Sequence, residues 1–85
     1  MSQVECFEID GLQCWFYSND HDPPHFHVKR RGEWEMRVYF AEGEGRMFDL
    51  KWRDRPGTKL LRRLGELVAA HRIQLQAEWE AKVNR

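Results

Sequence analysis

The sequence of 85 residues has no net charge, few cysteines and no long hydrophobic run. Its 14 basic and 14 acidic side chains cancel, so the composition does not favour a general attraction to nucleic acid or to anionic membranes. No apolar stretch approaches the roughly 20 residues that cross a bilayer, and the first residues lack the basic and apolar regions of a signal peptide. We therefore expect a cytoplasmic protein with no membrane association.

The charges are unevenly distributed along the chain. Residues 1–28 contain no Lys or Arg, whereas residues 51–63 contain six basic side chains and a single acidic one. A solvated helix end explains such a basic cluster, and a nucleic-acid-binding patch is the alternative. The length suits one modest hydrophobic core, so we expect residues 1–85 to form a single domain.

The only cysteines are Cys6 and Cys14. Residues 4–9 and 12–17 are rich in apolar and aromatic side chains and flank Asp10-Gly11, which predicts a tight hairpin. The expected register directs the two cysteines to opposite sides of the sheet, and this favours free thiols over a disulfide. A Cys2His2 zinc site is the alternative, although the paired C-x-x-C spacing of such sites is missing.

The densest group of reactive side chains lies in residues 19–28, which read N-D-H-D-P-P-H-F-H-V and hold three of the four histidines. Pro23 and Pro24 fix their own φ angles and favour extended conformations for the residues before them. A helix therefore cannot run through this segment. A tight loop that leads into a strand is expected instead.

The residues after Pro24 alternate between imidazole and apolar side chains. Successive side chains of a strand point to opposite faces, so Phe26 and Val28 are expected to face a core. His25 and His27 would then share the other face. With His21 in the loop just before them, the three imidazoles are predicted to form a compact cluster.

The alternation continues in residues 33–40, where the even-numbered positions are apolar. A three-residue loop at residues 30–32 sorts core from solvent across the resulting hairpin, and Gly32 supplies the left-handed conformation that such loops need. This register predicts two cross-strand pairs on the polar face: His27 with Glu35, and His25 with Arg37.

A further strand is predicted over residues 46–52, and apolar residues then recur at spacings of three and four up to residue 83. This spacing predicts an amphipathic helix with Thr58 as its N-cap. A straight helix of roughly 25 residues would be about 38 Å long and would overhang so small a domain. We therefore expect a bend or a break near residues 70–73.

These elements predict an α+β fold. A four- or five-stranded, mainly antiparallel sheet is expected over residues 4–52, packed on one face by one kinked helix or two helices over residues 58–83. The other face carries the histidines. The expected core consists of Phe7, Ile9, Phe16, Phe26, Val28, Trp34, Met36, Leu64, Val68, Leu75 and Trp79.

The sequence resembles a widespread bacterial family catalogued as domain of unknown function 4160. The resemblance covers nearly the whole chain, its most specific part is the D-H-x-P-P-H-F-H motif, and it rests on residues 15–28, 32–35, 71–72 and 78–80. Because the family has no assigned activity, the resemblance implies no reaction and no ligand. Its members are often encoded beside a small protein of domain-of-unknown-function family 2442, an arrangement similar to toxin–antitoxin pairs. The resemblance therefore implies a small protein partner encoded nearby.

Neutral imidazoles with nearby carboxylates suit Zn, Ni, Mn or Fe, and such a set is present here. The candidate metal ligands are Asp20, His21, His25, His27 and Glu35. RNA cleavage would need a pair of histidines, or a histidine with a basic stabiliser, and the candidate catalytic residues are His21, His25, His27, Glu35 and Arg37. The alternative is a structural cluster in which the imidazoles bond loop carbonyls and carboxylates.

The sequence therefore leaves three functions open. The first is an interaction module that acts with a protein partner, such as one half of a toxin–antitoxin-like pair. The second is a metal-dependent or histidine-based enzyme that acts on nucleic-acid phosphodiesters. The third is a metal-binding protein without catalysis. An edge strand or the open sheet face is also a candidate surface for a homodimer.

Overall fold

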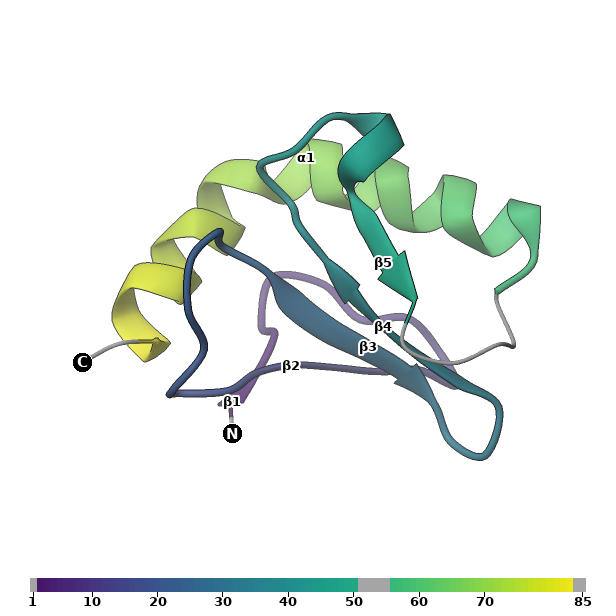
Figure 1. The fold of residues 1–85 in the computed structure, drawn as a ribbon, viewed down its shortest axis with the longest axis horizontal. Coiled ribbons are helices and arrows are strands. Elements are labelled where there is room, and N and C mark those ends of the chain that lie inside the picture. Colours follow the sequence, from purple (N-terminus) through teal and green to yellow (C-terminus); the bar gives the residue numbers. More distant parts are fainter. Residues whose placement is uncertain (1, 51–55, 84–85) are drawn as a thin grey trace.

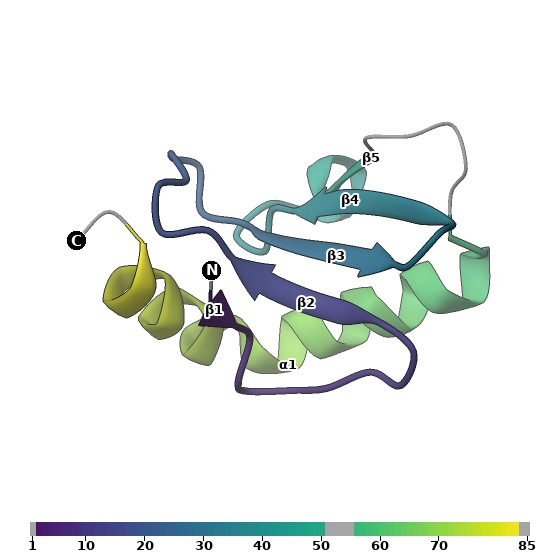
Figure 2. The ribbon, with the colours of Figure 1, turned by 90° about the horizontal axis from the view of Figure 1, so that it is seen from below.

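The computed structural model describes residues 2–50 and 56–83, which form a five-stranded antiparallel sheet and a long helix that covers one face of it (Figures 1 and 2). Each strand pairs with the next one along the chain. The elements are β1 (Ser2–Gln3), β2 (Gln13–Phe16), β3 (Phe26–Arg30), β4 (Trp34–Val38), the 3₁₀ helix η1 (Glu44–Arg46), β5 (Phe48–Leu50) and α1 (Thr58–Lys82). The predicted α+β fold is thus confirmed. Among these residues no helix is long and apolar enough to span a bilayer.

The core lies between α1 and the face of the sheet that carries the apolar residues of β3 and β4. Phe26 pairs with Val38 and Val28 with Met36, and all four side chains are fully buried. Every predicted core residue belongs to this hydrophobic core except Ile9, which is half-buried and packs against the core. Further members are Val4, Cys14, Val38, Phe40, Met47 and Val83.

The turn between β3 and β4 fixes the register of the hairpin. The Glu33 N–H donates to the Arg30 carbonyl over 3.0 Å, and Gly32 has a φ of 79° at the third position of this turn. A type II turn requires a positive φ at that position, which glycine adopts without steric cost. The loop therefore consists of residues 31–33, and Arg30 pairs with Trp34.

The observed register lies two residues away from the predicted one. His27 pairs with Arg37, and Glu35 pairs with Lys29. The predicted pairs of His27 with Glu35 and of His25 with Arg37 are therefore wrong. Registers two residues apart keep every side chain on the same face, so alternation alone could not distinguish them.

The segment before β2 does not form the predicted long strand. Of this segment, the two residues of β1 form the strand that pairs with β2. The expected turn at Asp10-Gly11 is present, with a φ of 82° at the glycine. The backbone N–H groups of Glu5 and Cys6 donate to the two carboxylate oxygens of Glu78 on α1, at 2.8 and 3.0 Å. The end of the helix thus replaces the strand partner that these groups would otherwise need.

Helix α1 follows Gly57 at the N-cap rather than the predicted Thr58, and it is kinked at His71. His71 has a φ of −122° and a ψ of 19°, and its Nδ1 lies 2.9 Å from the Leu67 carbonyl oxygen. That carbonyl is the regular partner of the backbone N–H four residues later, and a side chain that competes for it bends a helix. The bend confirms the kinked alternative, and it directs the second half of α1 towards β1 (Figure 1).

The last predicted strand begins two residues later than expected. It spans residues 48–50, and η1 occupies the start of the predicted range. Residues 51 and 52 lie outside the described part of the chain.

Replacement of Trp79 by alanine is expected to lower the free energy of unfolding by about 3–5 kcal/mol, because this is the usual cost of truncating a buried Trp. The Trp79 side chain is 5 % exposed and packs against Phe16. Urea denaturation measures the change. Ile73→Ala on the same helix is the matched control, because Ile73 is 86 % exposed. Equal midpoints for the two variants would contradict the packing of the second half of α1.

A second prediction concerns Glu78. Burial acts to raise the pKa of its carboxyl, but hydrogen bonds from Lys82 and from the Glu5 and Cys6 backbone outweigh it and lower that pKa below its usual value. A lowered pKa stabilises the fold above the unfolded-state value, and this stabilisation is lost as the pH falls through the folded-state value. Glu78→Gln should therefore cost about 1–3 kcal/mol at pH 7.

The difference between wild type and Glu78→Gln should shrink as the pH falls below 4.5, the ordinary pKa of this carboxyl. Urea denaturation between pH 3 and pH 7 tests this dependence. Glu66→Gln on the exposed part of α1 serves as the control. A difference that stays constant over this range would show that the charge of Glu78 does not stabilise the fold.

Candidate functional site

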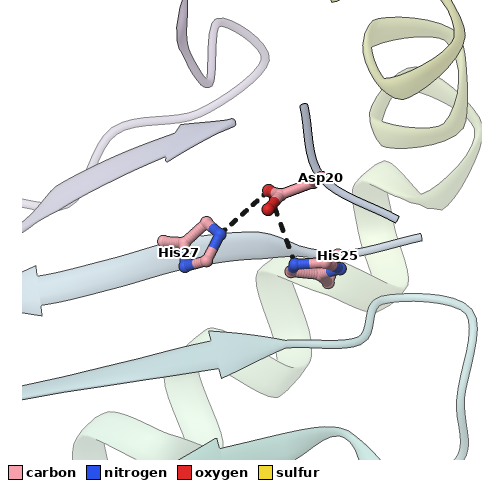
Figure 3. Close-up of side chains that lie close together, drawn as sticks. All are labelled: Asp20, His25 and His27. Atoms are coloured by element: carbon pink, nitrogen blue, oxygen red, sulfur yellow. Dashed lines mark hydrogen bonds and ion pairs between the residues drawn. The ribbon is translucent and has the colours of Figure 1, made fainter. Parts of the chain in front are cut away.

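Three polar side chains converge where the chain enters β3 (Figure 3). His27 lies on β3, His25 directly precedes it, and Asp20 belongs to the loop that joins β2 to β3. The Asp20 Oδ2 atom lies 2.9 Å from His27 Nε2 and 3.4 Å from His25 Nε2. Each residue offers one potential metal-ligating atom, and these atoms all lie within 4.8 Å of one another.

A turn closed by two hydrogen bonds between Tyr17 and Asp20 holds Asp20 in this position. The Asp20 N–H donates to the Tyr17 carbonyl over 3.2 Å, and the Tyr17 N–H donates to Asp20 Oδ2 over 3.3 Å. Short acidic side chains favour turns because they can accept hydrogen bonds from nearby backbone. The same carboxylate oxygen therefore closes the loop and faces both imidazoles.

The tautomer of His25 follows from its second hydrogen bond. Its Nδ1 lies 2.9 Å from the Pro23 carbonyl oxygen. A carbonyl only accepts, so Nδ1 must carry a hydrogen, and a neutral His25 then has its lone pair on Nε2. That lone pair faces the Asp20 carboxylate, which is also an acceptor. The contact is favourable only with a proton or another cation between the two atoms.

Aromatic rings enclose the two imidazoles. The Trp15 ring stacks on His27 with a centroid distance of 5.5 Å, and the Tyr17 ring lies 4.7 Å from His27. The Trp79 ring from α1 lies 5.5 Å from His25. His25 and His27 are consequently only 6 % and 2 % exposed. The apolar walls keep water from much of the cluster and strengthen its internal electrostatic interactions.

A small cleft of about 190 Å³ opens beside the cluster. It is lined by Asp20, His21, Asp22, Pro23, His25, Arg37 and Tyr39. The Arg37 guanidinium reaches Asp49 of β5 at 3.4 Å. A residue with a permanent positive charge thus lines the same cleft as two members of the cluster.

The structure brings together some of the predicted site residues and separates others. Asp20, His25 and His27 form the cluster, and Arg37 borders the cleft. His21 is exposed and lines the cleft without joining the cluster. Glu35 lies across from Lys29, which is farther along the hairpin, so its assignment as a partner of His27 is wrong.

Two features of the site do not appear among the predicted site residues. Tyr39 lines the cleft, and its ring lies 5.1 Å from that of His25. Tyr39 lies two residues after Arg37, so the period of two along the chain could have predicted that both residues lie on the polar face of the sheet. The Pro23 carbonyl that orients His25 has no signal in the sequence, because its direction depends on the conformation of the loop.

The cysteines take no part in this site. Cys14 is buried in the core, Cys6 is half-buried near Glu78, and both are free thiols, as predicted. In the described part of the chain, the group that could hold a metal ion consists of Asp20, His25 and His27 and includes neither cysteine. The Cys2His2 alternative therefore receives no support.

The comparisons with known proteins identify the family. A family model described as "Domain of unknown function (DUF4160)" matches residues 11–80. The match covers most of the chain, including the cluster and Arg37, so the chain belongs to this family and the resemblance seen in the sequence is confirmed. Searches of curated proteins and of solved structures each gave no match.

The two thiols are expected to react slowly in the folded protein. Burial raises the pKa of Cys14 to about 12, and burial together with the nearby Glu78 carboxylate raises the pKa of Cys6 to about 12. Only the thiolate reacts, so alkylation by iodoacetamide at pH 8 should be roughly a thousandfold slower than in urea. Mass spectrometry over time measures both rates. Rapid labelling of the folded chain, or a disulfide in unreduced protein, would contradict this account.

Proposed function

We propose that this protein binds a divalent first-row transition metal through Asp20, His25 and His27. The observation that supports the proposal is the spacing of their ligand atoms, all within 4.8 Å of one another. Ligand atoms held tetrahedrally at about 2.0–2.2 Å from Zn²⁺ lie roughly 3.3–3.6 Å apart. Side-chain movements of about 1.5 Å or less would close the cluster onto an ion.

The electrostatics of His25 also favour a cation. Its Nδ1–H is committed to the Pro23 carbonyl, so the lone pair of Nε2 and the Asp20 carboxylate face each other. A metal ion between them turns a contact of two acceptors into two coordination bonds. Metal-ligating histidines commonly donate their other N–H to a backbone carbonyl, as His25 does here. If the cluster has only a structural role, a proton rather than a metal ion lies between His25 Nε2 and the Asp20 carboxylate.

The donor set limits the chemistry of the site. Two imidazoles and one carboxylate suit Zn²⁺, Fe²⁺, Ni²⁺ or Mn²⁺. Three protein ligands leave at least one coordination position open, as in catalytic metal sites. The cleft that Asp20 and His25 border would give a second molecule access to that position.

Association with a protein encoded nearby is a separate proposal that rests on the family resemblance, whereas a homodimer would rest on an edge strand or the open sheet face. The partner encoded nearby and the homodimer remain predictions, as does the toxin–antitoxin-like pairing. Co-purification of this chain with the products of its neighbouring genes tests the first of them.

Titration of tag-free apo-protein with Zn²⁺ and Co²⁺ at pH 7.5 tests the metal site. Micromolar or tighter binding is expected, together with the visible absorption of protein-bound Co²⁺. Asp20→Asn, His25→Gln and His27→Gln should each weaken binding at least tenfold, because each removes a ligand. Elemental analysis of protein purified without a His-tag identifies the resident metal.

His21→Gln is the matched control, because this exposed histidine does not belong to the cluster. It should retain the wild-type affinity. Thermal melts show whether each variant is folded, and Asp20→Asn keeps the size of the side chain should the histidine variants fail to fold. Absence of binding by folded wild type, or binding indifferent to Asp20, His25 and His27, would refute the proposal.

A further inference from the structure

The cleft beside the metal site has walls of two kinds. Its lining includes the metal-ligating residues Asp20 and His25 as well as Arg37 and Tyr39 of the segment that begins with β4. Arg37 pairs directly with His27 across β3 and β4, so it projects from the same face of the sheet. A molecule in the cleft would therefore touch metal ligands and a guanidinium at once.

The charge of the cleft would change sign when a metal binds. Its lining carries the carboxylates of Asp20 and Asp22 and the guanidinium of Arg37, which leaves one net negative charge with neutral imidazoles. A divalent cation held by the cluster would turn this into one net positive charge. The metal-loaded cleft would then favour an anion, and the apo-protein would not.

The size of the cleft limits what it can enclose. Pockets that enclose whole drug-sized ligands are about 300–1,000 Å³, whereas this cleft is about 190 Å³. It suits one tetrahedral oxyanion, with the rest of a larger ligand outside. Arginine binds phosphate oxygens in pairs through its planar fork, and an open position on a metal ion accepts another oxygen.

Arg37 is able to serve such a ligand. Its contact with Asp49 is 3.4 Å long, and the two side chains are 39 % and 52 % exposed. Exposed ion pairs of this kind contribute little to stability, so the guanidinium can exchange Asp49 for a ligand oxygen at small cost. Asp49 meanwhile contacts the guanidinium of Arg37, a residue that lines the cleft.

We propose that the metal-loaded cleft binds a phosphate group, with one oxygen on the metal ion and others on Arg37. The proposal rests on the metal site proposed above. It names the class of ligand: inorganic phosphate, a terminal phosphate or the phosphodiester of a nucleic acid. By reciprocity, bound phosphate would also raise the affinity for the metal.

The test uses Co²⁺-loaded full-length protein, titrated separately with inorganic phosphate, with a 5′-phosphorylated RNA dinucleotide and with the same dinucleotide lacking the terminal phosphate. Calorimetry measures affinity, and the Co²⁺ absorption reports a new ligand on the metal. Saturable binding of at least one probe to the loaded form, and at least tenfold weaker binding to the apo form, is expected. The probe that binds tightest identifies the source of the phosphate.

Arg37→Gln should weaken phosphate binding at least tenfold without weakening Co²⁺ binding, because Arg37 is not a metal ligand. Arg31→Gln, an exposed arginine in the β3–β4 loop, is the matched control and should alter neither. Co²⁺ binding without any phosphate binding, or phosphate binding that Arg37→Gln does not weaken, would overturn this inference alone. Failure to bind Co²⁺ would overturn the metal site as well.

Discussion

The alternation of side chains along β3 is the constraint on which both the core and the candidate site depend. Phe26 and Val28 are fully buried on the face that α1 covers, and His27 between them points to the other face. A slip of one residue would remove both apolar side chains from the core, at a cost of about 1.5–3 kcal/mol each. The hydrophobic core therefore sets the direction of the His27 imidazole, whereas the Pro23 carbonyl orients His25 and the turn with Tyr17 holds Asp20.

Alternation also decides how much of the site the sequence could predict. A period of two is enough to place His25 and His27 together, and turn chemistry is enough to suggest Asp20. The same period could not choose between Glu35 and Arg37 as the partner of His27, because both lie on the polar face of β4. The choice depends on the hydrogen bond between Glu33 and Arg30, whose geometry the residue types do not fix.

The N-terminal segment shows a different limit of sequence reasoning. Residues 4–9 have the composition of a strand and are followed by the predicted turn, yet they do not extend the sheet. The Glu78 carboxylate takes the N–H groups of Glu5 and Cys6 from 73 and 72 residues away. No local pattern encodes a contact of that separation, so the fold class was predictable and the course of this segment was not.

The kink in α1 brings the second half of the helix into contact with the candidate site. Because the helix bends at His71, its second half turns towards β1, and Trp79 contacts both Phe16 in the core and His25 in the cluster. A ligand that binds the folded state but not the unfolded state stabilises the fold, by about 2.7 kcal/mol when the ligand concentration is a hundred times the Kd. A metal ion that fixed His25 would therefore also stabilise the packing of Trp79 against the sheet. The contact between Trp79 and His25 also affects the cluster. If the end of the helix moved away from the sheet, the cluster would lose the Trp79 ring and water could reach it.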